Sequence, residues 1–170
     1  AGLESRDTAK TFIYALVYGA GDEKIGKVIG GTRKQGSELK RNFLDNLPSL
    51  KNLKDKVQRA SNRGFLKGLD GRKIYVRSQH AALNTLLQGG GAIVMKKAMC
   101  FLQELIDLNV LDAKFVANIH DEWQIQVKES QADLVGQLGV ESIEKTGKHF
   151  NMRCPLTGEY KIGGNWSETH

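Results

Sequence analysis

Hydrophobic residues recur every three or four positions through the first third of the chain, which is the spacing of amphipathic helices. The pattern predicts four helices, which glycine pairs and Pro48 separate. These helices would cover residues 5–19, 22–29, about 39–47 and 50–60. On the first of them, five residues fall on one side and are expected to face a core: Ala9, Phe12, Ile13, Leu16 and Ala20.

The pattern changes character between Phe65 and Val76, where two short apolar runs flank Leu69-Asp70-Gly71-Arg72. Asp-Gly between two such runs is a strong signal for a two-residue hairpin turn. This segment therefore predicts a first β-hairpin.

A long helical pattern then runs from about Gln79 to Leu108, interrupted by the three glycines of residues 89–91. Each glycine inside a helix costs about 1 kcal/mol relative to alanine. We therefore expect a bend or a close approach of another segment at the glycines.

Residues 115–119 and 123–127 alternate between apolar and polar like two paired strands. The polar triplet His120-Asp121-Glu122 would form the turn between them. A last helix is predicted from Ser130 to about Lys148, followed by a strand-like or irregular tail.

Three groups of polar residues are candidates for chemistry. Arg6, Lys10, Tyr14 and Tyr18 are spaced four apart on the first helix, so two cations and two phenols share one face. A guanidinium and an ammonium are well suited to neutralise a polyphosphate. An ordinary solvated helix face is the alternative interpretation of this stripe.

The second group is the His120-Asp121-Glu122 turn, since adjacent carboxylates on a rigid hairpin can bind a hard divalent cation. Taken alone, such a triplet is more often only a hydrophilic turn. The third group places His80, Asn84 and Gln88 on one stripe of the long helix. Its alternative is again a solvated face.

Composition adds only general limits. A chain of 170 residues is long enough for one domain with a real core, and its net charge of +6 favours a polyanionic partner. Cys100 and Cys154 are the only cysteines and lack the spacing of a zinc site. Without a long apolar run or a leader of signal-peptide type, the chain is expected to be soluble and intracellular, with no membrane partner.

The string R-x3-K-x3-Y-x3-Y-G that starts at Arg6 resembles motif B of the family A DNA polymerases, the fingers helix that grips the incoming nucleotide. The resemblance implies that Arg6 and Lys10 hold the triphosphate and that Tyr14 packs at the sugar. Tyr18 with Gly19 would lie at the floor of the nascent base pair. We hypothesise that Lys10 also protonates the leaving pyrophosphate.

The His120-Asp121-Glu122 triplet resembles motif C of the same family and follows in the expected order. This implies Asp121 as a catalytic ligand of two Mg²⁺ ions, Glu122 as a supporting catalytic carboxylate and His120 as a contact to the primer end.

The helical stripe resembles the family's minor-groove contacts, which implies that His80, Asn84 and Gln88 bind DNA. His80 stands where many cellular members have Arg, and it places the resemblance in the replicative branch of short-tailed T-odd phages.

One element of the family is absent from the sequence. Motif A, a D-x-S-x-x-E strand that supplies the other metal-binding Asp, does not occur. We therefore expect the chain to start inside a longer polymerase. The family's exonuclease and thumb regions are also missing from this sequence. Its end, with Asn165-Trp166 closing on His170, resembles the family's own carboxyl terminus.

Together these features predict an α+β fold: a helical fingers subdomain and the C-terminal half of a polymerase palm with a central β-hairpin. The fingers would span residues 1–78, with a hairpin near 65–76, and the palm part residues 79–170, with the motif C hairpin at 115–127.

The expected function is template-directed DNA synthesis in phage replication, in the cytoplasm of an infected bacterium. The expected partners are primer-template DNA, dNTPs, a missing N-terminal polymerase segment on the same or a separate polypeptide, and a possible processivity factor. The alternative function is a non-catalytic module that binds nucleic acid or nucleotide.

Overall fold

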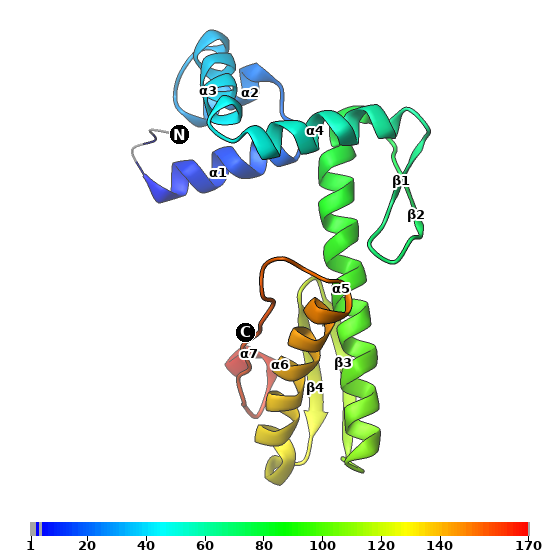
Figure 1. The fold of residues 1–170 in the computed structure, drawn as a ribbon. Helices are drawn as coiled ribbons and strands as arrows, with labels where there is room; N and C mark the ends of the chain where they lie inside the picture. Colours follow the sequence, from blue (N-terminus) through cyan, green and yellow to red (C-terminus); the bar gives the residue numbers. More distant parts are fainter. Residues whose placement is uncertain (1–2, 4, 170) are drawn as a thin grey trace. The chain divides into compact units, whose positions relative to one another are not determined.

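The computed structural model describes Leu3 and residues 5–169 of the chain. It forms two compact units that divide between Gly89 and Gly90. Each unit combines helices with one small antiparallel hairpin (Figure 1), so the predicted α+β class is confirmed.

The first unit begins with the four predicted helices: α1 (Arg6–Val17), α2 (Asp22–Val28), α3 (Arg33–Asp45) and α4 (Pro48–Ser61). Ser5 caps α1, because its hydroxyl accepts a hydrogen bond from the Thr8 amide at 3.1 Å. The helix α3 starts earlier than the hydrophobic pattern predicts. Its start is set by polar residues, a capping box between Thr32 and Gln35.

The core of these helices is centred on Phe12, which is fully buried and meets the ring of Phe43 edge-on with 5.1 Å between centroids. Ile25 and Leu44 complete this core. The prediction that Ile13 faces the core is wrong, since its side chain is 45% exposed. The buried arc of α1 runs through Phe12, Ala15 and Leu16, and Ile13 lies about 100° away from Phe12 at its edge.

The first hairpin pairs β1 (Phe65–Lys67) with β2 (Lys73–Tyr75). Its turn is longer than predicted. The Gly71 amide donates to the Gly68 carbonyl at 3.0 Å, and the Gly68 amide donates to the Arg72 carbonyl at 2.8 Å. Gly71 has a φ of 85° whereas Asp70 does not have a positive φ, so the loop is a three-residue turn and not the two-residue type that needs positive φ at both positions.

A 3₁₀ turn, η1 (Gln79–Ala81), leads into α5 (Ala82–Leu108), which continues without a break through the three glycines. The expected close approach is found at Gly89, where a Cβ atom would come within 2.8 Å of Cδ1 of Ile74. The boundary between the two units also falls within this glycine run.

The second unit builds on the antiparallel hairpin of β3 (Ala113–Ile119) and β4 (Glu122–Val127). A bulge at Val116 shifts the register between Phe115 and Ala117. The second half of α5 and the helix α6 (Ala132–His149), which follows η2 (Glu129–Gln131), pack on one face of the hairpin (Figure 1). Their shared core joins side chains from all these elements: Leu102, Ile106, Leu138, Phe115, Trp123 and Ile125.

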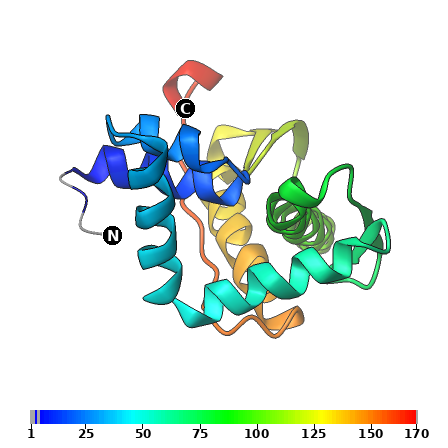
Figure 2. The same cartoon turned by 90° about the horizontal axis from the view of Figure 1, so that it is seen from above.

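The tail after α6 runs back along that helix and ends in a short helix, α7 (Trp166–Thr169), where an irregular or strand-like finish was expected (Figure 2). Glycine allows the tail to approach closely, because a Cβ atom on Gly136 would lie 2.3 Å from the Tyr160 ring. The Tyr160 hydroxyl donates to Asp133 Oδ1 at 3.0 Å, and this bond raises the pKa of Tyr160.

Candidate functional site

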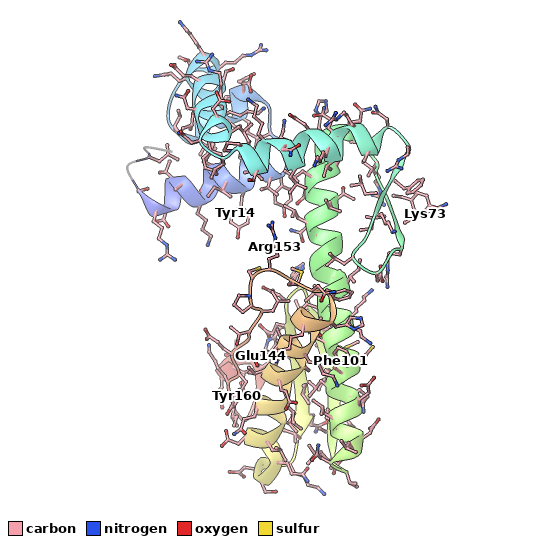
Figure 3. All side chains as sticks on the ribbon, viewed as in Figure 1. Tyr14, Lys73, Phe101, Glu144, Arg153 and Tyr160 are labelled. Atoms are coloured by element: carbon pink, nitrogen blue, oxygen red, sulfur yellow. The ribbon has the colours of Figure 1, made fainter. Side chains whose placement is uncertain are left out.

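The polar stripe of α1 lies on the exposed face of the helix. Arg6 and Lys10 are exposed, and the side chains of Tyr14 and Tyr18 are 55% and 56% exposed. In the described part of the chain neither cation has a carboxylate within ion-pair distance. Figure 3 shows Tyr14 projecting away from the ribbon of α1. The four side chains are thus available to a ligand, while Phe12 anchors the opposite face.

The end of α1 is closed by a backbone contact that only glycine permits. Gly19 has a φ of 76°, and a Cβ atom there would lie 2.1 Å from the carbonyl oxygen of His80. The structure therefore brings together Gly19 and His80, which the sequence places in two separate motifs. Any larger residue at position 19 would push η1 away from the end of α1.

A small hollow of about 80 Å³ opens beside this contact. Its polar lining comes from three segments of the first unit: Lys40 of α3, Lys54 and Gln58 of α4, and Gln79 and His80 of η1. Sequence reasoning did not select the two lysines, because they belong to no motif and only the fold brings them to Gly19.

One lysine of the hollow is already engaged. Lys40 Nζ donates to Asp22 Oδ1 at 3.2 Å, and this bond lowers the pKa of Asp22. Lys54 forms no ion pair within the described residues, so its charge remains available for an anion.

The predicted minor-groove stripe starts in η1 and continues into α5. His80 and Gln88 are exposed, whereas Asn84 is half-buried. The Oδ1 atom of Asn84 is buried and has no hydrogen-bond partner in the described residues. A buried polar atom without a partner is costly, so this amide needs a partner that the described residues do not provide.

The acidic turn lies in the second unit. Ile119 pairs with Glu122 across it, so His120 and Asp121 form a two-residue turn and Glu122 is the first residue of β4. His120 adopts a φ of 53°, which a tight turn of this kind requires. Both turn residues are exposed. No hydrogen bond or ion pair to the Asp121 carboxylate is found in the described residues, which leaves its oxygens free for a cation.

Glu122 is in a different situation, because its Oε1 atom accepts hydrogen bonds from two side chains. Gln124 Nε2 is one donor, and Trp166 Nε1 of α7 is the other at 3.1 Å. No pattern in the sequence indicates the second contact, since 44 positions separate the two residues.

The described residues contain neither a metal-binding cluster nor a membrane-spanning helix. No group of three or more His, Cys, Asp or Glu side chains is placed to hold a metal ion there. No described helix is long and apolar enough to cross a membrane.

Comparisons with known proteins agree with the fold. The model of DNA polymerase family A matches residues 2–168. The chain is 41% identical to the DNA-directed DNA polymerase of Enterobacteria phage T3 and 42% identical to that of Escherichia phage Phieco32. All of this chain is covered in both alignments, but it spans only 27% and 29% of those proteins.

A solved structure gives the same picture of the fold. It is described as the POL domain of Pol1 from M. smegmatis in complex with DNA primer-template and dNTP, and it matches with a TM-score of 0.75 at 21% identity. The match covers 89% of this chain and 28% of that one. With nearly the whole chain matched by the family model, the protein belongs to DNA polymerase family A.

Proposed function

We propose that the chain forms the part of a template-directed DNA polymerase that carries the nucleotide-binding helix and the motif C hairpin. The observation that carries this proposal is the exposed face of α1, where two cations share a helix face with two exposed tyrosines and have no carboxylate partner among the described residues. Membership of the family and the phage relatives, which are DNA-directed DNA polymerases, support it. We further propose that this activity serves phage replication inside an infected bacterium, and the phage relatives support this.

In this proposal α1 binds the incoming dNTP. Arg6 and Lys10 neutralise the triphosphate, and Lys10 also gives a proton to the leaving pyrophosphate. Tyr14 packs against the sugar, while Tyr18 and Gly19 form the floor under the new base pair. The Gly19–His80 contact fixes the end of the helix that carries them.

The residues of the acidic turn fit a divalent cation in their chemistry. Asp121 presents carboxylate oxygens that no other described residue engages, and such oxygens are the ligands that Mg²⁺ prefers. Glu122 lies next to it. When bound, Mg²⁺ supplies activation of the primer hydroxyl and neutralisation of phosphate charge. Asp121 would hold it with support from Glu122, and a motif A carboxylate from outside residues 1–170 would complete the site.

Primer-template DNA is the proposed macromolecular partner. His80, Asn84 and Gln88 would contact the minor groove, where the side-chain amides of Asn84 and Gln88 can donate to the purine N3 and pyrimidine O2 acceptors. His120 would contact the primer end. The proposed fingers span residues 1–78 and the proposed palm part spans residues 79–170. A processivity factor is a further proposed partner.

A non-catalytic module that binds nucleic acid or nucleotide is the second candidate. It is favoured by one observation: only two carboxylates, those of Asp121 and Glu122, lie at the acidic turn of the described chain. Such a module would use the same α1 face and the same basic surface, but would add no nucleotide.

A chimera separates the two candidates. Residues 1–170 replace the matching segment of the Escherichia phage T7 polymerase, to which the chain is 40% identical. We expect primer extension by the chimera, none by the isolated chain, and loss of extension with unchanged DNA binding in Asp121→Asn. The control is Asp112→Asn, because Asp112 is an exposed carboxylate at the far end of the same hairpin. Extension that survives Asp121→Asn would contradict the proposal.

A further inference from the structure

Two side chains of β4 face α7 and form one hydrogen-bonded chain with it. Glu122 and Gln124 are two positions apart on the strand and therefore point to the same side. Gln124 Nε2 donates to Glu122 Oε1, and Thr169 Oγ1 donates to Gln124 Oε1 at 3.3 Å. Trp166 Nε1 donates directly to Glu122 Oε1 at 3.1 Å. The short helix thus holds the Glu122 carboxylate both directly and through Gln124.

A helix of four residues needs support from outside, because helix nucleation is unfavourable. Glu168 provides it by accepting from the Gly164 amide at 2.7 Å and from the Asn165 side chain. The approach is close, since a Cβ atom on Gly163 would lie 2.7 Å from Cβ of Glu168. The segment Gly163 to Thr169 is therefore a braced unit and not a frayed end.

The path of the tail brings this unit back to the hairpin. Tyr160 packs on Gly136 and donates to Asp133, which ties the tail to α6 (Figure 3 labels Tyr160). Leu156 lies against Gly147, where a Cβ atom would meet it at 3.2 Å. The position of Trp166 thus depends on two earlier contacts with α6.

We propose that Trp166 is a positioning residue whose indole N–H fixes the Glu122 carboxylate beside Asp121. Its meaning for catalysis rests on the proposed polymerase function. Glu has three rotatable side-chain torsions and loses much freedom when it is fixed. The Trp166 N–H, held on the short helix, restricts the side-chain torsions of Glu122 before any ligand binds. The Glu122 carboxylate is therefore held in one orientation, while the Asp121 carboxylate can bind the cation.

The chain contains its own control. Trp123 is the neighbour of Glu122 in sequence, and its Nε1 atom is buried without a hydrogen-bond partner in the described residues. Its ring packs edge-on against Phe115 with 5.9 Å between centroids. Trp123→Phe and Trp166→Phe therefore remove the same N–H group, but only the second removes a donor to Glu122.

The first measurement uses the full 170-residue chain and needs no activity. Three-bond NMR couplings of the Glu122 side chain should show one dominant rotamer in the wild type and in Trp123→Phe, and averaged rotamers in Trp166→Phe. Averaged rotamers in the wild type, or equal order in both variants, would overturn the proposal.

The second measurement uses the chimera. Trp166→Phe should raise the Mg²⁺ concentration for half-maximal extension about two- to tenfold, which is the range that one ordinary hydrogen bond can provide. Primer-template affinity should not change, and Trp123→Phe should keep the parent's Mg²⁺ dependence. An unchanged Mg²⁺ dependence in Trp166→Phe would overturn the proposal. A chimera that extends no primer contradicts the proposed function instead, and the NMR couplings then decide the role of Trp166 by themselves.

Discussion

The exposed face of α1 and the acidic turn of the second hairpin are placed by different kinds of forces. On α1, the orientation of Arg6, Lys10 and Tyr14 follows from the burial of Phe12 on the same helix. At the turn, the orientation of Glu122 depends on Trp166, which is 44 positions away. A helix face is therefore fixed by local periodicity, whereas one side chain of the turn is fixed by a long-range contact.

The largest effect should come from removing the anchor of α1. Phe12→Ala deletes a fully buried ring from the core, and truncation of a buried Phe typically costs about 3–5 kcal/mol of unfolding free energy. Chemical denaturation followed by circular dichroism measures this loss. Ile13→Ala on the exposed side of the same helix is the matched control and should cost far less. Equal losses in the two variants would contradict the assignment of the buried face.

The next effect tests the exposed face itself. Arg6→Ala and Lys10→Ala should each weaken dNTP binding by about ten- to a hundredfold, since a hydrogen bond to a charged group contributes about 1.5–3 kcal/mol. Equilibrium dialysis of labelled dNTP against the chimera measures the affinity. Lys24→Ala, an exposed cation of α2 without an ion pair in the described residues, is the control. If Lys24→Ala weakens binding as much, the stripe is only part of a general positive surface.

Most of the fold could be predicted from the sequence. Hydrophobic period and turn residues predict the four helices of the first unit, the long helix with its glycines, and both hairpins. Errors arose where polar contacts override the apolar pattern. The capping box at Thr32 starts α3 early, and the first turn is longer than two residues, with the Arg72 amide donating to Asp70 Oδ1 at 3.1 Å.

The site was predictable only in its local parts. The four-residue spacing found the α1 stripe, and alternation around His120-Asp121-Glu122 found the turn. The lysines of the hollow and the Trp166 contact have no period or motif, because tertiary packing alone brings them to Gly19 and Glu122. Such contacts could be seen only after the chain had folded.

A third prediction tests the long-range contact between the tail and Glu122. Gly136→Ala should push the Tyr160 ring away from α6 and cost about 1–3 kcal/mol, the usual range for overpacking. It should also move the NMR signal of the Trp166 indole N–H, because the tail carries Trp166 to Glu122. Gly91→Ala in α5 is the control, since a Cβ atom there meets nothing within 4 Å. It should stabilise the helix and leave the indole signal in place.

The smallest effect concerns the ion pair beside the hollow at the end of α1. The bond from Lys40 lowers the pKa of Asp22 below its ordinary value of 3.8, so the ionised carboxylate is favoured in the folded chain. The pair therefore contributes stability above about pH 3.8, and this contribution is lost as the pH falls through the lowered pKa of Asp22. Lys40→Met should cost up to about 1 kcal/mol at neutral pH, with the difference from wild type vanishing in acid. Urea denaturation at a series of pH values measures this difference.

The control is Lys27→Met, whose exposed pair with Glu23 should contribute less. A Lys40→Met difference that stays constant down to low pH would show that the methylene stem of Lys40, and not its charge, provides the stability.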